Sequence, residues 1–149
     1  MWALCAKEIM KSIAVFLLLF SPACLCCSFP EQSELERFNN ARAVFHAKII
    51  GTELGVETHD GNETEVVFVT YKLIESFKGT QESTGIVKEI PFSPGNCMLG
   101  LLTGLEYVIY LEEHDFVTIP SGSWGFFNRK GNHVAPKLKE LRELANNGT

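Results

Sequence analysis

Hydrophobic residues along this chain gather into short segments that polar, glycine or proline residues separate. Residues 65–77 (EVVFVTYKLIESF) form the strongest of them, because valine, phenylalanine, threonine and tyrosine are enriched in strands. Residues 41–50, 85–90 and 105–111 have the same character, and residues 116–119 form a weaker segment. The pattern therefore predicts five short strands.

Turn signals lie between these segments. Asp60-Gly61-Asn62 stands at the centre of the polar stretch 55–64 and predicts a tight turn. Pro91 ends the strand before it, and residues 121–125 and 128–132 are predicted to be loops.

A helix is predicted on each side of the strands. Ser28 is suited to cap the first helix and Pro30 to its first turn, and this helix is expected to end near Asn39-Asn40. Residues 136–145 (PKLKELRELA) form a short amphipathic helix, with leucines at every third position. Five strands with a helix at each end favour a mainly β, five-stranded OB-type closed barrel over a two-sheet sandwich, which normally has about seven strands.

The first 23 residues have the layout of a secretory signal peptide. Lys7 and Lys11 precede the apolar run 12–20 (SIAVFLLLF), and Ser21-Pro22-Ala23 supplies small residues for cleavage. The run is too short to cross a bilayer, which takes about 20 apolar residues. We expect an exported domain, residues 24–149, that is secreted or periplasmic.

Charge narrows the class of partner. Residues 1–23 hold two of the 13 basic and one of the 18 acidic residues, so residues 24–149 keep 11 basic and 17 acidic side chains, a net charge of −6. Lysine and arginine supply most of the affinity for nucleic acid. An acidic domain without a basic cluster is therefore not expected to bind nucleic acid.

Four cysteines remain after the predicted cleavage: Cys24, Cys26, Cys27 and Cys97. Export places them where disulfides persist. Four cysteines allow three complete pairings, and their spacing does not choose among these.

Several of these segments, in this order, resemble the N-terminal domain of the tissue inhibitors of metalloproteinases and the wider netrin-like module. The resemblance starts with Cys24-Leu25-Cys26 directly after the signal peptide and continues with residues 43–48 (AVFHAK). It extends through Tyr71-Lys72-Leu73, Phe77-Lys78-Gly79, the single Cys97 and the strand 106–111 (EYVIYL). It covers about residues 24–119, and it implies a five-stranded OB-type barrel.

The resemblance also implies how such a domain acts. It implies a disulfide from Cys24 to Cys97, with Cys26 or Cys27 as the alternative partner of Cys97. The α-amine and carbonyl of Cys24 would then bind the catalytic zinc of a partner protease in trans, and Leu25 would enter its specificity pocket. Catalytic zinc sites keep an open coordination position, which such a chelate can occupy.

The chain departs from the family pattern in its cysteines. The family has a cysteine near the position of residues 118–121 (TIPS), and this chain has none. Cys27 is additional, the third bridge of the family is missing, and the C-terminal domain of the animal inhibitors is not found. These departures fit a minimal form of the module, such as a bacterial relative.

Other interpretations of the cysteines stay open. Lipidation of Cys24 would anchor the domain to a membrane, although the leucine expected three residues before a lipidated cysteine is missing. The C-x-x-C frame of residues 24–27 opens no helix after a strand, as a thiol oxidoreductase requires. Cys97 with His114 is the only pair for cysteine catalysis. Bound zinc is not expected, because the four histidines lack ligand spacing: His46, His59, His114 and His133.

Trp124 is the remaining candidate for binding. With Phe126 and Phe127 it lies in a glycine-flanked loop, either as an apolar contact patch or as a cover for the open end of the barrel. Taken together, the sequence predicts a protein-binding domain with no catalysis and no cofactor, whose partner is a protein and specifically a zinc metalloprotease. The alternative is a non-inhibitory envelope or extracellular interaction module that binds through a barrel face or the Trp124 loop.

Overall fold

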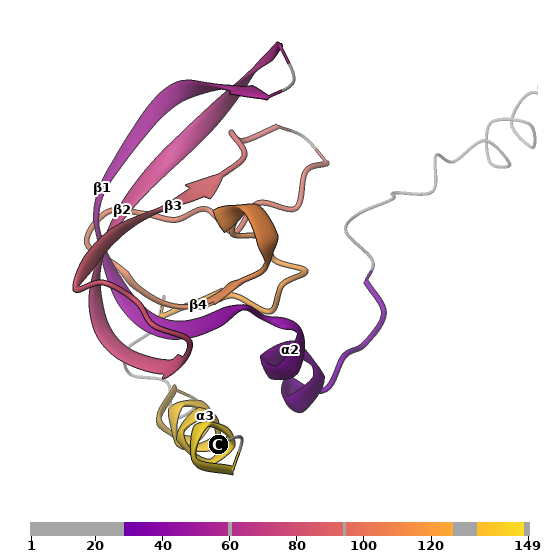
Figure 1. The fold of residues 1–149 in the computed structure, drawn as a ribbon, viewed down its shortest axis with the longest axis vertical. Helices are drawn as coiled ribbons and strands as arrows, with labels where there is room; N and C mark the ends of the chain where they lie inside the picture. Colours follow the sequence, from indigo (N-terminus) through magenta and orange to yellow (C-terminus); the bar gives the residue numbers. More distant parts are fainter. Residues whose placement is uncertain (1–28, 60, 94, 127–133, 148–149) are drawn as a thin grey trace, which may run out of the picture.

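A computed structural model describes residues 29–59, 61–93, 95–126 and 134–147 (Figure 1). The described part is mainly β, with five strands in one sheet and two helices. In chain order the elements are α2 (Glu34–Asn40), β1 (Ala43–His59), β2 (Asn62–Lys78), β3 (Thr84–Glu89), β4 (Glu106–Leu111), the 3-10 turn η1 (Glu113–Asp115), β5 (Trp124–Gly125) and α3 (Val134–Asn147). The predicted signal peptide, residues 1–23, and the predicted loop 128–132 lie outside the described residues.

Helix α2 begins later than predicted. Its cap is Ser33, not Ser28: the Ser33 hydroxyl accepts a hydrogen bond from the Glu36 amide at 3.3 Å. The Glu36 carboxylate in turn accepts one from the Ser33 amide at 2.8 Å. This reciprocal capping box satisfies two donors at the helix start. The predicted end near Asn40 is confirmed.

Strands β1 and β2 form one long hairpin. Each has 17 residues, and they pair antiparallel up to His59 opposite Asn62, with register shifts after Val44, His46 and Ile49. The predicted turn centre is confirmed, with Gly61 at φ +79°. The strands continue through most of the polar stretch 55–64, beyond their predicted ends at residues 50 and 65, because polar strand residues are stable wherever the neighbouring strand satisfies their backbone and their side chains reach water.

The predictions for β3, β4 and α3 are confirmed within one or two residues at each end. The prediction for residues 116–119 is wrong. Only Phe116 pairs there, in one isolated parallel bridge with Lys88. The fifth strand is instead β5, which pairs with Tyr107 and Val108 of β4.

The sheet is open, with strand order β3-β2-β1-β4-β5, so the predicted closed barrel is not supported. All the strand pairs are antiparallel. Between β3 and the segment after η1, the bridge at Phe116 and the hydrogen bond from the Val117 amide to the Lys88 carbonyl at 2.7 Å are isolated contacts. His114 and Asp115 have φ of +69° and +62°, which interrupts the extended backbone that a closing strand needs.

The curved sheet has a core on each face. One face of β1 sends Phe45 into the main core, while the adjacent Val44 points into a second core near both helices. The helices lie at the end of the sheet away from the hairpin tip (Figure 1). None of the described helices is both long and apolar enough to cross a membrane.

Candidate functional site

The loop between β3 and β4 carries Cys97, the residue that the resemblance singles out for a disulfide. Cys97 is half-buried and disulfide-bonded, and the cysteine across that bond lies outside the described residues. Its carbonyl accepts a hydrogen bond from the Ile119 amide at 3.0 Å. The other predicted residues of this site, Cys24, Leu25, Cys26 and Cys27, also lie outside the described residues, so their pairing and roles stay predictions.

A buried carboxylate fixes this loop to the sheet. Glu89 is only 2% exposed, and its two oxygens accept hydrogen bonds from the amides of Gly100 at 2.6 Å and Leu101 at 2.9 Å. Its face of β3 also carries Val87, so an acidic residue takes a core position. Two amide donors offset the cost of burying this charge, and both come from the Cys97 loop.

Tyr107 fixes the same loop from the other side. Its hydroxyl accepts from the Leu102 amide and donates to the Gly100 carbonyl, both at 3.0 Å. Burial raises the pKa of this hydroxyl, which keeps it protonated and able to donate. The loop is therefore held at three successive residues.

Apolar side chains are exposed on both sides of Cys97. Phe92 lies on the N-terminal side of Cys97 in the sequence and is 80% exposed. Ile119, whose amide bonds the Cys97 carbonyl, is about half exposed. The loop thus combines an anchored backbone with apolar contact groups.

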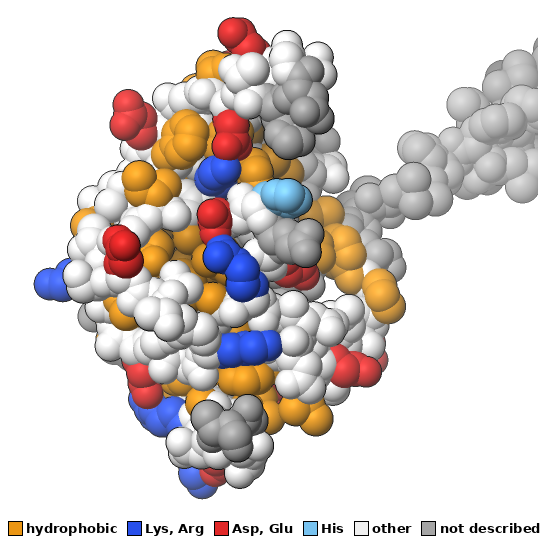
Figure 2. Space-filling view, in the orientation of Figure 1, with side chains coloured by type: hydrophobic (Ala, Val, Ile, Leu, Met, Phe, Trp, Pro, Cys, Tyr) orange, Lys and Arg blue, Asp and Glu red, His pale blue; other side chains and the backbone are white. Residues whose placement is uncertain are grey.

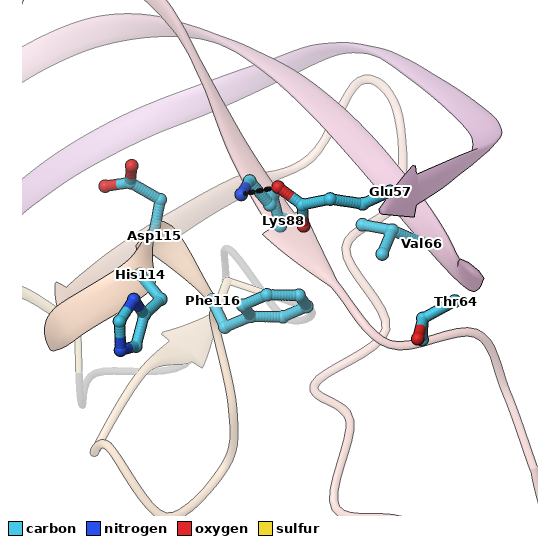
Figure 3. A pocket seen from close by; sticks show the side chains of 7 residues that line it. All are labelled: Glu57, Thr64, Val66, Lys88, His114, Asp115 and Phe116. Atoms are coloured by element: carbon cyan, nitrogen blue, oxygen red, sulfur yellow. Dashed lines mark hydrogen bonds and ion pairs between the residues drawn. The ribbon is translucent and has the colours of Figure 1, made fainter. Parts of the chain in front are cut away.

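A pocket of about 390 Å³ lies under the tip of the β1–β2 hairpin (Figure 3). We call it the Lys88 pocket. The hairpin, β3 and the η1 segment supply its lining: Glu57, Thr64, Val66, Lys88, His114, Asp115 and Phe116. On the face shown in Figure 2, acidic, basic and hydrophobic side chains are interspersed, as they are in this lining.

The cation of this pocket is Lys88. Its Nζ donates to Glu57 Oε1 at 2.5 Å and lies 5.5 Å from the centre of the Phe116 ring. Because the ammonium is held between a carboxylate and an aromatic face, only 22% of the side chain is exposed.

The pocket wall at His114 and Asp115 has an unusual backbone. Two consecutive residues other than glycine have positive φ. Such conformations cost of order 1–3 kcal/mol each and persist only where surrounding contacts hold them. Here Arg42 forms an ion pair with Asp115, and a second hollow of about 550 Å³ lies beside it, lined by Asn40, Arg42, Glu112 and His114.

The cysteine–histidine pair of Cys97 and His114, which the sequence offered only as a disfavoured alternative, lacks its nucleophile. His114 is exposed on the pocket rim, whereas the sulfur of Cys97 is committed to a disulfide. A Cys–His mechanism needs a free thiolate.

Trp124 is half-buried against the second core. Its ring meets Phe126 edge to face, with the ring centres 4.9 Å apart, and Lys137 Nζ of α3 lies 5.0 Å from its centre. This placement favours a covering role over an exposed contact patch. Phe127 lies outside the described residues.

His46 is a satisfied core histidine. Its Nε2 lies 3.2 Å from Glu106 Oε2, and its ring packs edge to face on Phe126. Burial lowers the pKa of His46, although Glu106 opposes that effect. Within the described ranges, no three histidine, cysteine, aspartate or glutamate side chains come together as a metal site.

No protein-family model matches the chain, and no curated protein matches it significantly.

Proposed function

We propose that this chain is an exported protein-binding domain that inhibits a zinc metalloprotease through the α-amine and carbonyl of Cys24. In this proposal a signal peptide, residues 1–23, is removed, and Cys24 is disulfide-bonded to Cys97. Leu25 enters the specificity pocket of the protease. The domain has no catalytic activity and needs no cofactor of its own.

The anchoring of the Cys97 loop is the observation that carries this proposal. Glu89 and Tyr107 hold the loop at residues 100–102 through four hydrogen bonds. An N-terminal residue tied to such a loop loses little further freedom on binding, and preorganisation of this kind improves affinity. Burying an acidic side chain costs free energy. Its use here to fix the Cys97 loop supports a functional role for the position of that loop.

The surface next to Cys97 also supports a protein partner. Phe92, in the loop that carries Cys97, and Ile119, whose amide bonds the Cys97 carbonyl, expose apolar side chains. Interfaces are commonly built around aromatic and aliphatic anchors of this kind.

The sheet supports an OB-type arrangement as part of the proposal. β1 pairs with both β2 and β4, and β3 lies beside β2 on the far edge. The parallel bridge between Lys88 and Phe116 brings the chain after β4 next to β3. OB-folds are five-stranded, partly open Greek-key structures, which this arrangement fits.

The free amine of Cys24 provides the decisive test. The protein that begins at Cys24 is compared with one that carries a single alanine before Cys24, against a panel of zinc proteases. We expect inhibition by the first and none by the second, because the extension removes the zinc ligand while the fold is kept. Leu25→Gly should weaken inhibition about tenfold or more, since a buried leucine contributes roughly 1.5–3 kcal/mol. Leu35→Ala, at an exposed position on α2, is the matched control.

Other outcomes separate the alternatives. A diacylglyceryl group on Cys24 would identify a lipoprotein, with the membrane as its site of action. A partner that tolerates both the extension and Leu25→Gly but is lost with Trp124→Ala would identify a non-inhibitory interaction module. If the unmodified protein inhibits no zinc protease at micromolar concentration, the inhibitor proposal is wrong.

A further inference from the structure

The Lys88 pocket is built on the face of the sheet that turns away from the main core. Lys88 pairs with Phe68 across the ladder, so it projects on the same side as Val66 and Thr64. Val87, beside Lys88, points into the main core instead. In the same way Val117 enters that core, while Phe116 turns to the pocket, as Figure 3 shows.

Lys88 brings unused hydrogen-bonding capacity into this pocket. An ammonium has three donors, and among the described residues only the Glu57 carboxylate accepts from it. The rest of its surroundings is largely apolar, with Phe116 beneath the cation and the fully buried Val66 nearby. Such an environment strengthens a charge-assisted hydrogen bond to an anion.

The acidic residue on the opposite wall does not cancel this cation. Asp115 is paired with Arg42, outside the Lys88–Glu57 pair. The positive φ of both His114 and Asp115 shapes this wall, and strained residues of this kind cluster at ligand sites. Glu57 is thus the one carboxylate that competes for Lys88.

We propose that the Lys88 pocket binds a small organic carboxylate with an apolar body. The carboxylate accepts hydrogen bonds from Lys88 Nζ, and the apolar body packs on Phe116 and Val66. The volume of about 390 Å³ lies in the lower part of the range of small-molecule sites, so a monocarboxylate of modest size fits it. This site is independent of Cys24, and the inhibitor proposal can fail without affecting it.

The competition with Glu57 predicts the direction in which a substitution of Glu57 changes the affinity for an anion. A bound carboxylate has to share Lys88 with Glu57 or displace it. Removing the negative charge of Glu57 therefore strengthens the binding of an anion. A site for a cation responds in the opposite direction, because Glu57 is then its main ligand.

The test uses the full exported chain with its disulfide intact, labelled with ¹⁵N and titrated with benzoate. We expect saturable amide shifts at Val66, Lys88 and Phe116, and none with benzamide, the neutral analogue of the same shape. Lys88→Met should raise the dissociation constant for benzoate about tenfold or more, since hydrogen bonds to charged groups are the strong ones. Glu57→Gln should lower it, and Lys72→Met, an exposed lysine elsewhere on β2, should leave it unchanged.

Three results would overturn the proposal. These are binding of benzamide as tight as that of benzoate, undiminished affinity of the Lys88→Met protein for benzoate, and weaker binding of benzoate by the Glu57→Gln protein. Circular dichroism shows whether the Lys88→Met protein is folded. If it is not folded, the Glu57→Gln protein decides the question. This substitution should strengthen the binding of benzoate, an anion, and should weaken any binding of benzylamine, a cation.

Discussion

The carboxylate of Glu89 on β3 lies 2.6 Å from the amide nitrogen of Gly100, in the loop that carries Cys97. A residue at a core position of the sheet thus sets the place of a loop 11 residues further along the chain. The neighbouring Leu101 amide binds the same carboxylate. The buried carboxylate of Glu89 therefore holds the candidate functional loop in place.

Replacing Glu89 should loosen that loop. Glu89→Gln puts an amide NH₂ where the loop offers a second N–H donor, and the charge that strengthens both bonds is lost. We expect the free energy of unfolding in urea to fall by about 2 kcal/mol, with faster hydrogen exchange at Gly100 and Leu101. Glu82→Gln, at an exposed position, is the control and should change stability by less than about 0.5 kcal/mol. Equal effects of the two variants would contradict the anchoring role.

The disulfide at Cys97 should stabilise the fold. If its partner is Cys24, the bond closes a long loop, for which chain entropy predicts about 4 kcal/mol. Cys97→Ser should then lower the melting temperature clearly. Peptide mapping without reduction identifies the partner cysteine, and a free Cys97 thiol in the exported protein would refute this prediction.

Two adjacent residues of α3 should differ sharply in their contribution to stability. Leu141 is almost fully buried in the second core, and Leu141→Ala should cost about 2–5 kcal/mol. Arg142 forms two 2.7 Å hydrogen bonds with Glu75 of β2, but in an exposed setting. Arg142→Met should therefore cost much less stability than Leu141→Ala, and less still at high salt. Chemical denaturation of both variants gives the comparison, and a larger loss from Arg142→Met would contradict it.

His46 should make stability depend on pH. Its pKa in the folded protein lies below the ordinary value of 6.5, chiefly because the ring is desolvated. The unfolded chain then binds a proton more readily, so stability is fully present above pH 6.5 and falls as the pH drops through this value. Glu106 and Glu75 oppose the shift, and Arg142 adds to it.

Two measurements check this expectation. An NMR titration of the His46 ring should give a midpoint below 6.5. In His46→Gln, the loss of stability on acidification should become shallower than in the unchanged protein. A midpoint above 6.5 would mean that Glu106 outweighs desolvation.

Local patterns were enough to predict most elements of the fold. The hairpin turn at Gly61, the strands β2, β3 and β4, and helix α3 all lie where periodicity and turn residues place them. These signals act between residues a few positions apart, so a single sequence contains them. The cap of α2 was placed too early because Ser28 and Ser33 each have a glutamate three residues later, Glu31 and Glu36, and the sequence therefore offers the same capping box at both positions.

The sequence predicted only some of the residues of the candidate site. Cys97 was named through a resemblance, but Glu89 and Lys88 were not. One signal was available for Glu89: two residues from Val87 on a strand, it has to share the core face of that residue. No comparable signal exists for Lys88, because Glu57 and Phe116 reach it from strand segments about 30 residues away in either direction.

What the sequence alone determined is where the chain extends, turns and coils, and that its domain is mainly β. The tertiary structure decided the features that depend on contacts between distant parts of the chain. The polar half of the hairpin is a strand because β1 and β2 satisfy each other's backbone, and the sheet stays open because the chain after His114 and Asp115 makes only an isolated bridge to β3 at Phe116. Pairing partners, closure and pockets depend on contacts between distant segments, and those contacts exist only once the chain has folded.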